Sequence, residues 1–220
     1  CMGRDLVLNT LKHEKTDRVP WVPFAGVHAG KLKGYTGEEI LKDADKLVEA
    51  LLEVNKLYMP DGMPVMFDLQ IEAEILGCTL LWAKDNPPSV RSHPLADEKS
   101  IPCRCMMPSK ESGRIPMILD VMRRVKAAIG QQTALYGLIC GPFTLASHLR
   151  GTGIFMDMIK DSQYVKDLMD FCSEVCIQMA DLYIEAGMDV IAVVDPLVSQ
   201  VSPKHIEAML SDGFIAIFDY

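Results

Sequence analysis

The residues best placed for chemistry in this sequence stand where apolar runs end. Asp68 and Asp195 each close a short apolar run, and the segment Gly141-Pro142-Phe143-Thr144 follows the longer run Thr133–Cys140. Parallel strands present their carboxyl ends to one set of loops, where binding pockets form. Each aspartate alone could equally cap a helix or form a turn. Three such positions in one chain predict a shared pocket, with Asp68 and Asp195 as candidate catalytic groups.

Two histidines are further candidates for this pocket. His28 follows the first predicted strand, and His148 lies one helical turn beyond the Gly-Pro-Phe-Thr segment. Either imidazole could bind a ligand, since its charge changes near neutral pH, or could be an ordinary surface or capping side chain. The predicted substrate-binding residues are therefore His28, Gly141, Pro142, Phe143, Thr144 and His148.

The cysteines do not form a recognisable metal motif. Cys103-Arg104-Cys105 lacks the second ligand pair that structural zinc sites have. Cys172 and Cys176 are one helical turn apart, but they share an apolar stripe that favours core packing. The sequence therefore predicts no metal ligand, and it predicts reduced thiols for its seven cysteines.

The elements that must hold these residues alternate between strands and helices. Apolar residues at three- and four-residue spacing predict helices, and short apolar runs bounded by turn residues predict strands. The predicted helices are Arg4–Lys12, Gly37–Tyr58 as one helix or two abutting ones, Ile71–Leu76, Ile118–Ile129 and Asp161–Ala186; the predicted strands are Val19–Phe24, Pro64–Leu69, Thr133–Cys140 and Asp189–Val194, with a hairpin between Thr79–Trp82 and Ser89–Ser92. Residues 101–114 lack periodicity, which predicts an exposed connection.

This alternation determines the predicted fold class. Strands that are covered on both faces and separated by long helices require parallel crossovers, which leaves a doubly wound sheet or a TIM barrel. A barrel needs eight strand-helix units and about 250 residues. This chain of 220 residues supplies four or five units. The alternation therefore predicts an α/β fold with a parallel sheet and leaves both of these arrangements open.

Composition excludes several classes of partner. The net charge is −8 with a pI of about 5.1, and the basic residues are scattered, so a phosphate backbone meets no basic surface. No apolar run reaches the length of a membrane span, and the N-terminus has no signal-peptide pattern. These features predict a cytoplasmic protein that binds neither nucleic acid nor membranes.

Four segments of the sequence resemble one known family. They are Arg18-Val19-Pro20-Trp21; Met66-Phe67-Asp68-Leu69 with Glu72–Cys78; Gly141–Ser147; and Glu185–Asp195 with Val201-Ser202-Pro203. In this order they resemble the uroporphyrinogen decarboxylase superfamily, over nearly the whole chain to about Leu210. The resemblance implies an α/β fold of the (β/α)8 TIM-barrel type, with residues 1–220 as one barrel domain. In this family an aspartate at the position of Asp68 overlooks the pocket.

The loop after the first predicted strand separates two branches of that superfamily. The decarboxylase branch holds the acetate and propionate groups of a tetrapyrrole with an arginine-bearing loop, and a polycarboxylate needs several such cations. Here the segment Ala25–Lys31 contains one lysine, one histidine and no arginine. The sequence therefore looks more like the corrinoid-dependent branch, the methylcobamide:thiol methyltransferases.

The resemblance to the methyltransferases implies a cofactor and partners. In that branch zinc binds and deprotonates a thiol, commonly coenzyme M, and the thiolate takes the methyl group of a corrinoid carried on a partner protein. The zinc ligands of the branch are a His-x-Cys pair on a later strand and a further cysteine near the C-terminus, and neither occurs in these 220 residues. The resemblance thus implies a barrel truncated to its N-terminal half.

Three functions are compatible with these observations. The first is methyl transfer from a methylated corrinoid to a thiol. The second is uroporphyrinogen decarboxylation in tetrapyrrole biosynthesis, in which Asp68 would stabilise pyrrole intermediates without a metal. The third is a non-catalytic half-barrel that closes as a homodimer, because half a barrel leaves unpaired strand edges.

Overall fold

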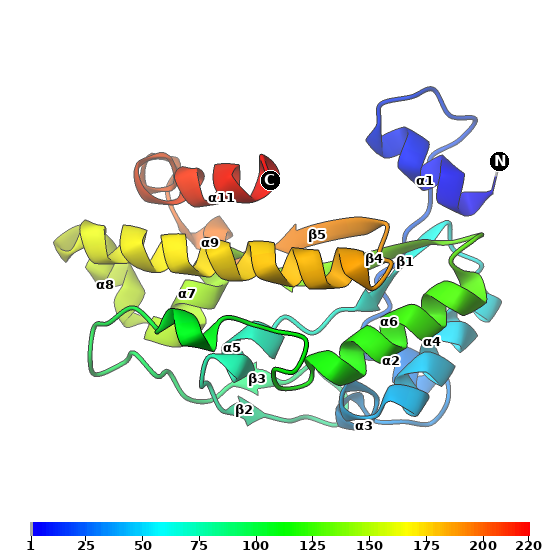
Figure 1. Cartoon of the computed structure of the whole chain (residues 1–220), viewed down its shortest axis with the longest axis horizontal. Coiled ribbons are helices and arrows are strands. Elements are labelled where there is room, and N and C mark those ends of the chain that lie inside the picture. Colours follow the sequence, from blue (N-terminus) through cyan, green and yellow to red (C-terminus); the bar gives the residue numbers. More distant parts are fainter. Residues whose placement is uncertain (1) are drawn as a thin grey trace.

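A computed structural model describes residues 2–220, and a parallel sheet lies at the centre of this part of the chain (Figure 1). The sheet is three-stranded, in the order β1 (Gly62–Met66), β4 (Ala134–Cys140) and β5 (Val190–Val194). A separate antiparallel hairpin pairs β2 (Leu80–Leu81) with β3 (Ser89–Val90). The parallel pairing and the hairpin are both as predicted. The strand order places β4 between the other two parallel strands.

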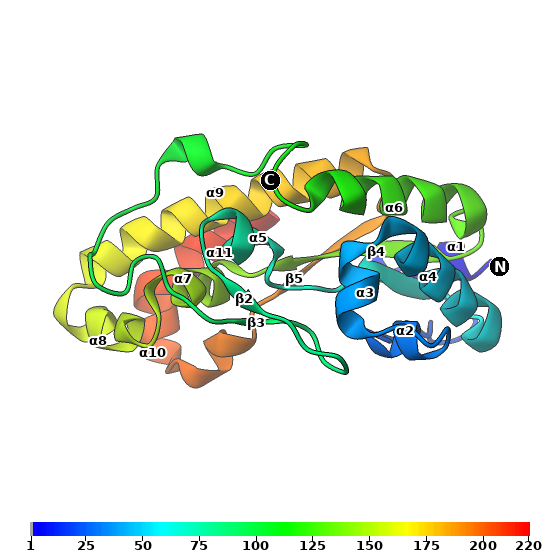
Figure 2. The same ribbon diagram turned by 90° about the horizontal axis from the view of Figure 1, so that it is seen from below.

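Helices surround this sheet unevenly. The α-helices are, in chain order, α1 (Gly3–Leu11), α2 (His28–Lys31), α3 (Gly37–Lys42), α4 (Ala44–Tyr58), α5 (Ile71–Ile75), α6 (Ile115–Ile129), α7 (Pro142–Arg150), α8 (Gly153–Lys160), α9 (Ser162–Glu185), α10 (Pro203–His205) and α11 (Ser211–Phe218), with 3-10 helices at Arg104–Met106 and Pro196–Gln200 and a π-helix at Ile206–Leu210. Helices α6 and α9 run along the sheet, whereas α7 and α8 lie beyond the carboxyl ends of the strands (Figures 1 and 2). Within residues 2–220, no helix combines the length and apolar character needed to cross a bilayer.

The long helix α9 shows how the sequence pattern determines the packing. Its start is capped by Asp161, whose side chain accepts a hydrogen bond from the Tyr164 amide. It is followed by Gly187 at φ +100°, a backbone conformation that favours glycine. The predicted apolar stripe from Val165 to Tyr183 is buried against β4 and β5. The predicted helix is therefore confirmed, because one buried face at helical spacing determines it.

The predicted helix Gly37–Tyr58 is two abutting helices, the second of the two predicted alternatives. The break falls at Asp43, whose extended backbone separates α3 from α4 and whose side chain caps α4 by accepting from the Lys46 amide. At the start of α3, Thr36 and Glu39 form a reciprocal capping box. Two capping signals in one apolar stripe thus mark two helices.

The predicted first strand, Val19–Phe24, is wrong. This segment is extended but joins no ladder, and its contact with β1 is the Trp21 carbonyl oxygen, which accepts from the amides of Asp61 at 2.9 Å and Gly62 at 3.4 Å. Pro20 and Pro23 have no amide hydrogen to donate, so a regular ladder cannot extend through the segment.

Two further expectations about the sheet need correction. The described residues contain three parallel strands rather than the predicted four or five strand-helix units. The predicted burial of β5 on both faces is also wrong, because all five of its residues are half-exposed. β5 is an edge strand that pairs with β4 alone in this part of the chain. Apolar composition alone did not distinguish an edge strand from a central one.

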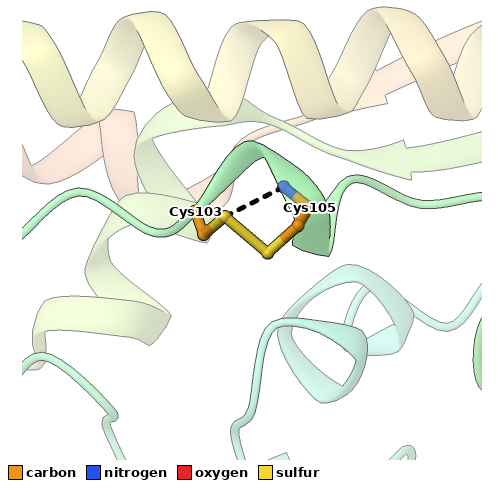
Figure 3. The surroundings of a disulfide bond; sticks show 2 residues. All are labelled: Cys103 and Cys105. Carbon is orange, nitrogen blue, oxygen red and sulfur yellow. Dashed lines mark hydrogen bonds between the residues drawn. A yellow bond between two sulfur atoms is a disulfide. The ribbon is translucent and has the colours of Figure 1, made fainter.

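The predicted reduced state of the cysteines is wrong at one pair. Cys103 and Cys105 are joined by a disulfide in the exposed connection before α6 (Figure 3). Their spacing of two residues brings the sulfur atoms together within one turn, the 3-10 helix Arg104–Met106. Cys78, Cys140, Cys172 and Cys176 are free and buried, as predicted for packing thiols.

Removing this disulfide is expected to change the stability of the fold only slightly. The bridge closes a loop of three residues, so it restricts the unfolded chain little, and its chain-entropy contribution is at most about 2 kcal/mol. The double variant Cys103→Ser/Cys105→Ser should therefore unfold in urea within that margin of the wild type. A much larger loss would mean that the pair supports packing elsewhere in the molecule.

Candidate functional site

The carboxyl ends of the three parallel strands meet at one edge of the sheet. Asp68 lies two residues after β1, Gly141 follows β4 directly, and Asp195 follows β5 directly. Cys140 pairs with Val194 in the register of β4 and β5, so the chain segments that follow these two residues leave the sheet side by side. The structure therefore places the two predicted catalytic aspartates and the Gly-Pro-Phe-Thr segment at the same edge.

Asp195 holds the start of α7 against the end of β5. One carboxylate oxygen accepts from the Thr144 amide at 2.9 Å and from its hydroxyl at 2.6 Å, and the other accepts from the Phe143 amide at 2.8 Å. Gly141, at the N-cap of α7, has no side chain to satisfy these amides. Asp195 supplies that cap from another element and places a carboxylate at the positive end of the helix dipole.

Gly141 and Pro142 are the residues that this contact requires. A methyl group on the Gly141 α-carbon would overlap the side chain of Asp195, so only glycine lets the two segments approach. Pro142 occupies the first position of α7, where a missing amide hydrogen costs nothing. Phe143 is fully buried, and Thr144 also accepts from the Leu197 amide at 3.2 Å through its hydroxyl. The residue types of the Gly-Pro-Phe-Thr segment thus match the steric and hydrogen-bonding requirements of the contact with Asp195.

The electrostatic setting of Asp195 combines opposing effects. The side chain is half-buried, and burial raises its pKa above the ordinary value, although the hydrogen bonds from Thr144 and Phe143 act in the other direction. Such a carboxyl could hold an ordered hydrogen-bond network and could exchange a proton more readily than an exposed aspartate.

Asp68 is the centre of a buried ion pair. Its side chain has no exposed surface; it accepts from the Arg114 guanidinium at 2.6 Å and from the Gln70 amide at 2.9 Å. Arg114 also contacts Glu74 at 2.7 Å and donates to the Leu41 carbonyl oxygen at 3.1 Å. Burial raises the pKa of Asp68, and the charge of Arg114 opposes that rise. The network ties α3, α5 and the start of α6 to the end of β1.

Glu72 lies beneath the same edge, and sequence reasoning gave it no role. One of its oxygens accepts from the Cys140 amide at 2.9 Å, while the other is buried without a hydrogen-bond partner. The side chain is fully buried, and this raises its pKa to about 8, so the carboxyl is largely protonated at neutral pH. Glu72 and Arg114 are the functional candidates that the sequence missed. The signal for Glu72 was its place in the segment Glu72–Cys78.

The two predicted histidines lie in different places. His148 is one helical turn after Thr144 on α7, and with Phe155 and Leu197 it lines a cavity of about 260 Å³. Burial lowers the pKa of His148 to about 4, so its imidazole is neutral near pH 7. His28 is exposed and bonds to the hydroxyl of Tyr58 at 3.1 Å. Tyr58 ends α4 just before β1 begins, so the structure places His28 near the amino end of β1, away from Asp195.

The chain matches a known protein family over almost its whole length. The sequence profile described as uroporphyrinogen decarboxylase (URO-D) matches residues 2–218 of the chain. The chain belongs to the URO-D family. The resemblance inferred from the four sequence segments is therefore confirmed.

Individual members of the URO-D family are similar to the chain over most of its length. It is 28% identical to the methylcobamide:CoM methyltransferase MtbA of Methanosarcina acetivorans over 200 residues, which is 89% of this chain and 59% of the relative. It is 22% identical to the uroporphyrinogen decarboxylase of Sulfurovum over 185 residues, 81% of this chain and 53% of the relative. The chain thus spans somewhat more than half the length of these URO-D relatives.

A solved structure of a methyltransferase from Methanosarcina mazei has the same fold. It matches with a TM-score of 0.88 at 25% identity, and the match covers 98% of this chain and 66% of that one. This likeness and the parallel sheet confirm the predicted α/β class for this member of the URO-D family.

The described residues do not fit the zinc site expected for the methyltransferase branch. In residues 2–220, no three side chains of His, Cys, Asp or Glu come together as a metal site. The free cysteines at the core are buried, and burial raises the pKa of the Cys78 thiol to about 12. A thiol of this kind does not ionise readily to a metal-binding thiolate, so no step of a mechanism is assigned to zinc on these residues.

Proposed function

We propose that this URO-D family member takes part in methyl transfer from a methylated corrinoid, carried by a partner protein, to a small thiol such as coenzyme M. The observation that carries the proposal is the fold match to the Methanosarcina methyltransferase over 98% of the chain. The identity of 28% to a methylcobamide:CoM methyltransferase over 89% of the chain supports the same reaction class.

In this proposal the strand ends shape the floor of the reaction pocket. Asp195 and Thr144 fix the start of α7, and His148 lines the cavity one turn further along the helix. The Asp68 side chain is fully buried and cannot contact a substrate, so its role is to position Arg114. The residues thus bind and orient substrates, which is the contribution that pre-organised pockets make to a transfer reaction. Deprotonation of the thiol is not assigned to any of them.

The ion pairs formed by two arginines and one lysine favour methyl transfer over decarboxylation of uroporphyrinogen. Arg114 is paired with Asp68 and Glu74, and Arg150 is paired with Asp157 at 2.7 Å. Lys31, the lysine of the loop without arginine, contacts Asp85 at 3.3 Å. A ligand with many carboxylates needs cations that are free to form bidentate contacts. Arg114 and Arg150 are largely buried and already engaged by acidic groups of the protein, whereas the Lys31–Asp85 contact lies at the surface.

The proposal is tested by supplying both candidate substrates to the purified protein. Methylcobalamin and coenzyme M, with zinc added, should yield a methyl thioether that is detected by mass spectrometry. Uroporphyrinogen in a parallel incubation should remain unchanged. Production of coproporphyrinogen without a thioether would assign the decarboxylase activity instead, and the absence of both products from folded protein would support the non-catalytic alternative.

Thr144→Val is expected to lower the methyl-transfer rate at least about tenfold, since small displacements of a positioned pocket have effects of this size or larger. The change removes a hydroxyl that donates to Asp195 and accepts from the Leu197 amide. Ser173→Ala is the matched control, because Ser173 is a buried hydroxyl that donates to the Met169 carbonyl oxygen of its own helix. Equal rates for the two variants would contradict the role given to Thr144.

A further inference from the structure

The sulfur atoms of Cys103 and Cys105 differ from the other described thiols in their access to solvent. Both residues are exposed, in the connection that leads to α6. The remaining free thiols of residues 2–220 are buried, and burial raises their pKa well above the ordinary value, which makes them unreactive. They are Cys78, Cys140, Cys172 and Cys176. Among residues 2–220, thiol chemistry at the surface is therefore restricted to the exposed pair.

The disulfide between them does not hold the fold together. It joins two residues of a single turn and links no two helices or strands (Figure 3). The connection is attached to α9 by other contacts: Arg104 pairs with Glu174, and the Tyr164 hydroxyl donates to the Ser100 carbonyl oxygen at 3.3 Å. Opening the disulfide therefore leaves these attachments intact. Exposed disulfides without a structural task are the ones that exchange readily.

The two sulfur atoms are not equivalent. Cys103 stands at the N-cap of the 3-10 turn, and its Sγ accepts a hydrogen bond from the Cys105 amide at 3.2 Å. The same amide would stabilise a thiolate on Cys103 after the bond opens. Cys105 has no corresponding donor at its sulfur among the described contacts. Cys103 is consequently the better leaving group, and an attacking thiolate is directed to Cys105.

We propose that Cys103 and Cys105 form a thiol–disulfide exchange site that reacts with small-molecule thiols. A thiolate of the small molecule attacks Sγ of Cys105, the bond between the two protein sulfurs breaks, and Cys103 leaves as a thiolate. A second small thiolate then attacks the small-molecule sulfur of the mixed disulfide and releases Cys105. The protein disulfide gains two electrons and two protons, and two small thiols are oxidised to one disulfide. In the reverse direction the Cys105 thiolate attacks the small-molecule disulfide and releases one small thiolate. Cys103 then attacks the Cys105 sulfur of the mixed disulfide, closes the bond and releases the second small thiolate.

The exchange is tested on the folded protein with reduced glutathione as the probe. After incubation, free thiols are blocked with a maleimide, and the peptide that contains residues 103–105 is analysed by mass spectrometry. We expect two labels on this peptide after treatment and none before it. The buried cysteines should stay unlabelled, and the circular dichroism spectrum should not change. A disulfide that opens only when the protein unfolds would overturn the proposal, as would full labelling without any thiol treatment.

Single variants test the proposed difference between the two sulfurs. With oxidised glutathione near pH 7, Cys105→Ser should form a stable mixed disulfide at Cys103 at least about threefold faster than Cys103→Ser forms one at Cys105. Both adducts should persist, because neither variant retains the second cysteine that resolves them. Equal rates for the two single variants would contradict the assignment of Cys103.

Discussion

Replacing Arg114 with methionine is expected to destabilise the protein by about 3–5 kcal/mol, the range for removing one partner of a buried ion pair. The Asp68 side chain has no exposed surface and would lose its cationic partner, and Glu74 would lose its contact with the same guanidinium. The carboxylate would then stay buried without compensation or take up a proton. Urea-induced unfolding near pH 7, followed by circular dichroism, measures the change in the free energy of unfolding.

A second substitution and a matched control separate this effect from the loss of packing. Asp68→Asn in the Arg114→Met background should recover part of the loss, because the buried negative charge is gone. Arg124→Met is the control: Arg124 lies on the same helix, α6, but its contacts with Asp45 and Asp120 are on the surface. Surface pairs contribute little, so this variant should unfold almost as the wild type does. Similar losses for Arg114→Met and Arg124→Met would contradict the importance of the buried pair.

Local patterns were sufficient to predict most of the elements. The stripe of α9 and the apolar run of β4 each follow from the spacing of side chains within one segment, and both are present with ends close to those expected. The strand-end position of Asp195 could also be predicted, since it depends only on where the run of β5 stops. The strand predicted at Val19–Phe24 is absent because its prolines have no amide hydrogen to donate to a neighbouring strand. The spacing of apolar residues contains no information about this hydrogen bonding.

The partners of the strand-end residues could not be predicted in the same way. Asp68 and Arg114 are 46 residues apart, and Cys140 and Glu72 are 68 apart. The sequence of residues 101–114 predicted only an exposed connection, yet the side chain of Arg114 at its end is largely buried. His28 was placed by its position after a predicted strand, whereas the structure puts it beside Tyr58. Such contacts depend on how helices pack on the sheet, and periodicity within a segment contains no information about that packing.

Glu72 connects this packing to a measurable dependence on pH. Burial raises the pKa of its carboxyl to about 8 in the folded state, whereas the ordinary pKa of a glutamate carboxyl is 4.5. Between these values the folded protein binds more protons at this site than the unfolded chain does. The contribution of Glu72 to the free energy of unfolding is therefore unaffected by pH below about 4.5 and falls as the pH rises toward 8.

Glu72→Gln is expected to remove the decrease in the free energy of unfolding that Glu72 causes as the pH rises. The glutamine oxygen can still accept from the Cys140 amide, and its amide nitrogen takes the buried position that has no partner in the wild type. The variant should match the wild type in acid and become more stable than it as the pH rises. The difference should be on the order of 3–5 kcal/mol by pH 8 if the whole shift is expressed, since each unit of pKa shift corresponds to about 1.4 kcal/mol.

Urea unfolding of both proteins at several pH values between 4.5 and 8 measures this difference directly. Burial also raises the pKa of Asp68 and Asp195, and it lowers that of His148 to about 4, so the wild-type curve alone contains contributions of both signs. These contributions are common to the wild type and the variant and cancel in the difference, provided that the substitution leaves the neighbouring contacts in place. A difference that is constant with pH would mean that Glu72 ionises in the folded protein much as it does in the unfolded chain, and that its contact with the end of β4 does not involve a protonated carboxyl.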